Sequence, residues 1–141
     1  MELRKNAKLA LLRRIPLFSG CSKRELGEIA KIADELDFRE GKVLTREGAA
    51  GREFFVIVEG TAEATQGRKK LRTMGDGDFF GEISLLTDDA PTADVVATTV
   101  LRCLVIAGNE LKAFLLEEPS VMYRMLQVEA RRLRAANVWN G

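Results

Sequence analysis

The sequence contains no histidine, and only two cysteines, three prolines and one tryptophan among its 141 residues. Without histidine, Ser-His-Asp and Cys-His catalysis, histidine-ligated zinc and the usual general base near neutral pH are all excluded. No motif in the chain points to catalysis by carboxylates alone. We therefore expect a protein that is not an enzyme and that holds no metal and no resident cofactor.

The sequence also lacks an apolar run that approaches the roughly 18–20 residues of a membrane span. The net charge of +1 gives no overall field toward nucleic acid or an anionic membrane, so neither is an expected partner. Cys21 and Cys103 are far apart, and Cys103 lies in an apolar run, which favours a buried thiol over a disulfide. A cytoplasmic location is the default expectation.

Helical patterns occupy both ends of the chain. In residues 1–36, a basic helix over 4–14 precedes the capping box Ser22-Lys23-Arg24-Glu25 and an amphipathic helix. In residues 108–141, one apolar helical face ends at Pro119, and a second helix is predicted over 120–136. The apolar positions that define these faces are Leu26, Ile29, Ala30 and Ala33 at the first end and Leu111, Phe114 and Leu115 at the second.

Between the helices, residues 37–107 alternate short apolar runs with glycine turns, a pattern typical of an antiparallel jelly-roll β-barrel. The nearly continuous apolar run at 54–58 should be a central strand. The fold class expected is one domain, mainly β, with N-terminal helices and two C-terminal helices. The predicted strands are Lys42–Thr45, Glu53–Glu59, Thr61–Thr65, Leu71–Met74, Val95–Thr98 and Val100–Ile106.

Two stretches, EGKVLTREGAAGREFFVIVEGTAEA (40–64) and GDGDFFGEISLL (75–86), resemble the cyclic nucleotide-binding domain family. This is the sensor module of the catabolite activator protein, of the protein kinase A regulatory subunit and of nucleotide-gated channels. The resemblance covers roughly residues 10–136. It implies a phosphate-binding-type loop over 79–94, in which Gly81 opens a short helix whose amides hold a cyclic phosphate.

The resemblance also assigns roles within this loop. Glu82 occupies the position that accepts a hydrogen bond from the ribose 2′-hydroxyl, although it could instead cap the first turn of the helix. The ligand expected is cAMP or cGMP. The complete set of implied ligand-binding residues is Phe80, Gly81, Glu82, Ile83, Ser84, Pro91, Thr92 and Ala93.

The loop departs from the family at its phosphate-binding arginine. The family continues Pro-Arg-Thr/Ser-Ala-Thr, whereas this chain reads APTAD over 90–94, without the arginine on either alignment. Losing a charge-assisted bond of roughly 1.5–3 kcal/mol weakens binding about ten- to a hundred-fold. Aspartates at 88, 89 and 94 would add repulsion if they faced the phosphate, so a neutral or cationic compound is an alternative ligand. Arg72 and Arg102 are candidate replacement cations.

In the family the last helix closes over the base and often dimerises. Tyr123 or Trp139 is therefore a candidate base lid, although the position of Trp139 near the chain end favours a tail residue. The arginines at 131, 132 and 134 are interpreted as a solvated helix face. The candidate homodimer seam is the stripe Met122, Met125, Leu126 and Leu133.

These patterns support a regulatory, ligand-sensing module that signals to an unknown effector protein or domain. Ligand binding is expected to pull the C-terminal helices toward the barrel about a hinge near 108–119. The alternative is a degenerate domain that binds no cyclic nucleotide and acts as a dimerisation or protein-docking scaffold.

Overall fold

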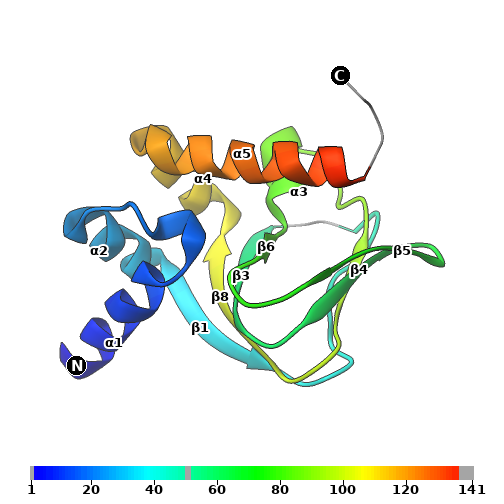
Figure 1. Cartoon of the computed structure of the whole chain (residues 1–141), viewed down its shortest axis with the longest axis horizontal. Helices are drawn as coiled ribbons and strands as arrows, with labels where there is room; N and C mark the ends of the chain where they lie inside the picture. Colours follow the sequence, from blue (N-terminus) through cyan, green and yellow to red (C-terminus); the bar gives the residue numbers. More distant parts are fainter. Residues whose placement is uncertain (1, 50–51, 137–141) are drawn as a thin grey trace.

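The computed structural model describes residues 2–49 and 52–136 (Figure 1). The predicted order of helices, β-domain and helices is confirmed. The helical elements are α1 (Glu2–Arg13), the 3-10 turn η1 (Pro16–Phe18), α2 (Lys23–Ile32), α3 (Glu82–Thr87), α4 (Gly108–Glu117) and α5 (Pro119–Ala135). The strands are β1 (Ala33–Phe38), β2 (Val43–Thr45), β3 (Glu53–Glu59), β4 (Ala62–Gln66), β5 (Lys69–Met74), β6 (Phe79–Phe80), β7 (Asp94–Ala97) and β8 (Leu101–Ala107).

The strands form two four-stranded sheets, in the orders β1-β8-β3-β6 and β2-β7-β4-β5. Every paired neighbour is antiparallel. Within the described residues no hydrogen-bonded ladder joins one sheet to the other, so the jelly roll is not a closed barrel. The predicted class, mainly antiparallel β with flanking helices, is confirmed.

Strand β3 is buried on both of its faces, which explains its nearly continuous apolar sequence. Phe54 and Val56 belong to the core under the helices, whereas Phe55 and Ile57 belong to the core between the sheets. Alternate residues of a strand point to opposite faces, so one apolar run serves both cores. Because β3 lies between β8 and β6, the prediction of a central strand is confirmed.

Two strands differ from the prediction. Strand β1 begins at Ala33, inside the segment assigned to helices, and the two-residue strand β6 was not predicted. In β1 only Ala33 is buried, and Asp34, Glu35 and Asp37 are exposed, so no apolar alternation marks this edge strand. Its pairing with β8 fixes its extended conformation instead.

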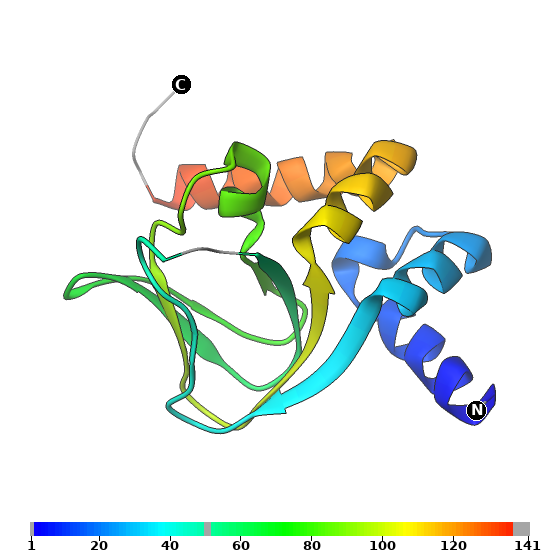
Figure 2. The same cartoon turned by 180° about the vertical axis from the view of Figure 1, so that it is seen from behind.

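The N-terminal helices cover the outer side of β1 and β8, away from the second sheet (Figure 2). Helix α2 starts at the predicted capping box: Glu25 N donates to Ser22 Oγ (3.1 Å), and Ser22 N donates to Glu25 Oε1 (2.7 Å). Cys103 is buried and Cys21 half-buried, and both are free thiols, as predicted. Of the helices in 2–49 and 52–136, none combines the length and the apolar character that crossing a bilayer requires.

Helix α5 runs across one end of the two sheets and passes beside α3 (Figures 1 and 2). Its buried side chains, Val121 and Met125, join the core under the helices. This placement brings the C-terminal half of α5 over the loop that the sequence singles out.

Candidate functional site

The loop is shaped by Gly81, between β6 and α3. Strand β6 pairs with β3, and the chain then turns at Gly81 with φ of 95° before α3 begins at Glu82. A Cβ at Gly81 would lie 2.5 Å from the carbonyl oxygen of Glu53. Because the positive φ and this close approach both require glycine, the short helix predicted after Gly81 is confirmed together with the reason for its position.

A small cavity of about 90 Å³ lies between this loop, the second sheet and α5. It brings together every residue that the sequence implied as ligand-binding. These eight lining residues are Phe80, Gly81, Glu82, Ile83, Ser84, Pro91, Thr92 and Ala93. The cavity is also lined by Thr45, Ala64, Leu71, Arg72, Met74, Val95 and Arg132, which the motif does not specify.

Glu82 is the buried carboxylate of this cavity, with 3% of its surface exposed. Its Oε1 accepts a hydrogen bond from Arg132 Nη1 at 3.1 Å. Its Oε2 is buried and has no hydrogen-bond partner among the described residues. A buried acceptor without a donor is costly, so Oε2 is suited to a ligand that brings a hydroxyl or amine.

Arg132 reaches this carboxylate from α5. Its Nη2 donates to the carbonyl oxygen of Phe79 at 2.6 Å, and its Nη1 also lies 3.1 Å from Glu129 Oε1. The guanidinium carbon sits 4.5 Å from the centre of the Phe79 ring. Only 13% of the side chain is exposed, so the interpretation of Arg132 as part of a solvated face is wrong.

A sequence signal for Arg132 existed. It follows the buried Val121 and Met125 and the half-buried Val128 at spacings of 11, 7 and 4 positions, on the inward face of α5. An arginine on an apolar helical face indicates a buried partner, and here that partner is 50 positions away in sequence.

The pKa of Glu82 is raised to about 8. Burial is the largest cause, the neighbouring Glu129 adds to it, and Arg132 opposes it. Two carboxylates share one guanidinium, and the more deeply buried one favours its protonated form. Perturbed carboxyl groups inside pockets are common at functional sites.

The acidic residues of the loop point away from the cavity. Asp88 pairs with Lys112 Nζ at 2.6 Å, and Asp94 Oδ1 accepts a hydrogen bond from Glu47 N at 2.7 Å. Asp88 and Asp89 line a separate hollow of about 870 Å³, and none of the three aspartates lines the cavity. The repulsion considered from the sequence therefore has no structural basis.

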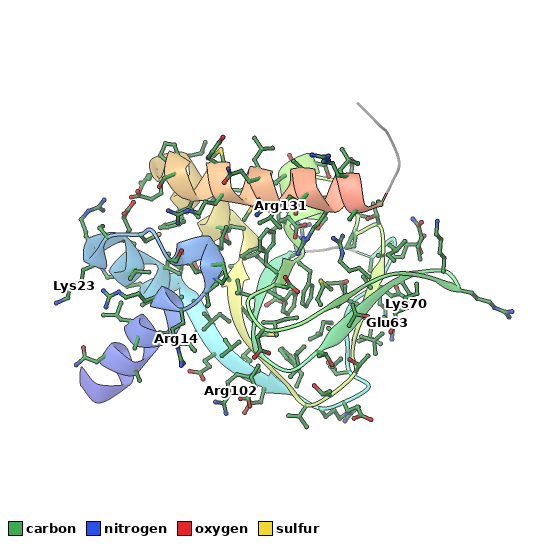
Figure 3. All side chains as sticks on the ribbon, in the orientation of Figure 1. Arg14, Lys23, Glu63, Lys70, Arg102 and Arg131 are labelled. Carbon is green, nitrogen blue, oxygen red and sulfur yellow. The ribbon has the colours of Figure 1, made fainter. Side chains whose placement is uncertain are left out.

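The two candidate replacement cations lie in different places. Arg102 pairs with Asp37 (3.0 Å) and Glu35 (3.6 Å), at the end of the molecule away from α5 (Figure 3). Its assignment as a replacement cation is therefore wrong. Arg72, on β5, lines the cavity.

Two features were predicted for the C-terminal helix, a base lid and a dimer seam, and the structure supports only part of this prediction. Tyr123 is 62% exposed and does not line the cavity, which does not support it as a base lid. Trp139 lies outside the described residues. In the predicted dimer seam, Met125 is buried at 2% exposure because it packs in the core, so its place in an exposed stripe is wrong. Met122, Leu126 and Leu133 are exposed, as that stripe requires.

Within residues 2–49 and 52–136, no group of three or more cysteine, aspartate or glutamate side chains could hold a metal ion. The lining of the cavity suits an organic ligand: apolar walls, one buried carboxylate and two guanidinium groups. The fold is thus a jelly roll whose pocket is bordered by a C-terminal helix. Residues 35–118 match the family model of the cyclic nucleotide-binding domain, and the chain belongs to this family.

The chain is similar to regulators of transcription and of kinases. It is 29% identical over 132 residues to a CRP-like cAMP-activated global transcriptional regulator of Mycobacterium tuberculosis, covering 90% of this chain and 59% of that protein. It is 30% identical over 104 residues to a cAMP-dependent protein kinase regulatory subunit of Hypocrea atroviridis, covering 74% and 22%. The chain therefore spans less than two thirds of the length of these relatives.

A solved structure shows the same fold. The regulatory subunit of a cAMP-independent protein kinase A from Trypanosoma brucei superposes with a TM-score of 0.83 at 24% identity, covering 92% of this chain and 47% of that one. A triple mutant of the same protein, bound to cAMP, superposes with a TM-score of 0.71, covering 90% of this chain and 52% of that one. One of the three substitutions in that mutant introduces an arginine.

Proposed function

We propose that this domain is a non-enzymatic sensor of a cyclic nucleotide or a related hydroxyl-bearing compound, and that it signals through α5. The observation that carries the proposal is the contact between Arg132 Nη1 and Glu82 Oε1, at 3.1 Å. The carboxylate that the family motif assigns to the ribose is the one that holds the C-terminal helix. A ligand hydroxyl on Glu82 therefore competes with, or rearranges, the contact that docks α5.

The size of the cavity supports a movement on binding. Its volume of about 90 Å³ is below the roughly 300 Å³ at which pockets for organic ligands begin. The wall formed by Arg132 belongs to a helix end, whereas the other walls belong to the sheets, to α3 and to the loop that follows it. We propose that the ligand separates Arg132 from Glu82 and shifts the C-terminal turns of α5, about the predicted hinge near 108–119.

The direction of this movement differs from the expectation drawn from the sequence. That expectation has the ligand pulling the C-terminal helices toward the barrel. In the structure α5 already lies against the site through Arg132. Because the cavity holds only about 90 Å³, a ligand that bonds to Glu82 Oε2 has to displace Arg132 to make room. An effector protein or domain would bind the released end of α5.

We expect cyclic nucleotides to bind weakly, because the loop lacks its arginine. The protein kinase A regulatory subunit described as cAMP-independent, and its cAMP-bound mutant that gains an arginine, are consistent with this reasoning. Pro91→Arg should therefore increase the affinity for cAMP about tenfold or more. If Pro91→Arg leaves the cAMP affinity unchanged, a cyclic phosphate does not lie beside this part of the loop.

The primary test is calorimetric titration of the domain with cAMP and with cGMP up to millimolar concentration at low salt. Saturable heat that Glu82→Gln weakens, and that the exposed control Glu117→Gln leaves intact, would support the sensor. Amide hydrogen exchange in residues 128–135 should rise when the ligand is bound. Flat titrations with both nucleotides would contradict the proposal.

The alternative function is a dimerisation or docking scaffold without a nucleotide. The observation that favours it is the exposure of Leu126 (62%) and Leu133 (52%) on the outer face of α5. Exposed apolar side chains along one helix are suited to a second helix. A flat titration combined with a concentration-dependent dimer that Leu126→Glu dissociates would select this alternative.

A further inference from the structure

Three arginines gather around a groove between β5 and the end of α5. The groove has a volume of about 490 Å³, and its cationic lining residues are Arg72, Arg131 and Arg132. It adjoins the small cavity, because Leu71, Arg72 and Arg132 line both spaces. Figure 3 labels Arg131 on α5. A ligand seated on Glu82 therefore has an arginine-lined path out of the cavity.

The charge of this groove is only partly compensated. Arg132 is paired with Glu82 and Glu129, but neither Arg72 nor Arg131 forms an ion pair with any residue that the structure describes. Asp78 is the acidic residue that lines the groove, and its Oδ2 accepts a hydrogen bond from Gly75 N. The guanidinium groups of Arg72 and Arg131 are thus available to an anion, and that of Arg132 becomes available when it leaves Glu82.

Arg72 is the fixed member of this group. It lies on β5 opposite Ala64 of β4, so its backbone is held within the second sheet. Partial burial and the positive charge of Arg132 lower the pKa of Arg72, and nearby carboxylates raise it. The side chains of Arg72 and Arg132 line the same cavity and the same groove. Two positive charges repel each other, and an anion that lies between them offsets this repulsion.

We propose that this groove is an anion subsite, in which Arg72 and Arg132 bind a phosphate group of a ligand whose ribose lies against Glu82. The inference rests on the proposed function and deepens it. The subsite replaces the missing loop arginine from the opposite wall of the pocket. When the ribose hydroxyl takes Glu82, Arg132 exchanges a carboxylate partner for a phosphate. The ligand class is a phosphorylated ribonucleoside, bound by planar guanidinium groups that suit phosphate oxygens.

The test compares three probes that share one nucleoside: adenosine, adenosine 5′-monophosphate and cAMP. At low salt we expect at least one phosphate-bearing probe to bind about tenfold or more tightly than adenosine. Arg72→Gln should remove this excess, so that the phosphate-bearing probes bind this variant no more tightly than adenosine does. Arg68→Gln, an exposed arginine in the turn of the same hairpin, is the matched control and should retain the excess. Inorganic phosphate at millimolar concentration should compete with the phosphate-bearing probe.

The outcomes separate the subsite from the sensor. Equal affinities for all three probes, with adenosine binding still dependent on Glu82, would overturn the subsite and leave the sensor standing. A phosphate-dependent excess that survives Arg72→Gln, or that Arg68→Gln reduces equally, would also overturn the subsite. If no probe binds, both proposals fail.

Discussion

Two of the walls of the small cavity, one from the loop and one from α5, are built in different ways. The loop wall, residues 79–93, is one contiguous segment that turns at Gly81 and is shaped by the backbone. The helix wall is a single side chain, Arg132, which reaches Glu82 from 50 positions away. The local sequence determines the loop wall, whereas the helix wall forms only when α5 packs against the sheets. One wall of a site can therefore follow from a local motif while the other depends on tertiary packing.

The largest effect should come from breaking the loop wall at Gly81. Gly81→Ala adds a Cβ that would lie 2.5 Å from the Glu53 carbonyl oxygen, at a φ of 95°. We expect a loss of about 3 kcal/mol or more in the free energy of unfolding, measured with urea. Gly41→Ala is the control, because φ is 89° but nothing lies within 4 Å of its Cβ, and it should cost about 1 kcal/mol. Equal losses would show that the close approach to β3 is unimportant.

Breaking the helix wall should cost less. Arg132→Met leaves Glu82 buried without its partner, and we expect a loss of about 1–3 kcal/mol in the free energy of unfolding. The cost is limited because Glu82 can remain protonated. Arg134→Met, on the exposed side of α5, should change stability by no more than about 0.5 kcal/mol. The Arg132→Met loss should shrink in a Glu82→Gln background, since the two residues are coupled; full additivity would contradict the ion pair.

The loop wall could be predicted almost completely, because the resemblance to the family rests on a nearly contiguous motif that includes Gly81, the short helix and the eight lining residues. The strands with apolar alternation were also predicted from contiguous sequence. Strand β1 was not, since Asp34, Glu35 and Asp37 give it no apolar face and its pairing with β8 is a tertiary property. The roles of Arg132 and Arg72 likewise depend on which elements meet.

The pH dependence of stability should sharpen the contrast between Glu82 and an ordinary surface carboxylate. Its folded-state pKa of about 8 lies above the usual 4.5. Its contribution to stability is therefore fully present below about pH 4.5 and is lost as the pH rises through 8. Relative to Glu82→Gln, the protein should lose on the order of 3–4 kcal/mol between pH 5 and pH 8.5.

Urea unfolding across this pH range measures the difference between the two proteins. The charged groups around Glu82 are Glu129 and Arg132 on α5 and Arg72 on β5. Glu82→Gln leaves these three residues unchanged, so the difference between the two proteins reports on Glu82 alone. Parallel pH profiles for the two proteins would show that the carboxylate is ionised throughout, with Arg132 outweighing burial.

The smallest effect on stability should come from the outer face of α5. Leu126→Glu changes an exposed side chain, and we expect the free energy of unfolding of the monomer to shift by no more than about 0.5 kcal/mol. Its neighbour Met125 is buried, and Met125→Ala should cost about 2–4 kcal/mol. Analytical sedimentation of the Leu126→Glu protein measures its oligomeric state. A dimer that dissociates without loss of monomer stability would mean that the outer face binds a second copy while the inner face holds Glu82. One helix would then connect the oligomeric state to the pocket.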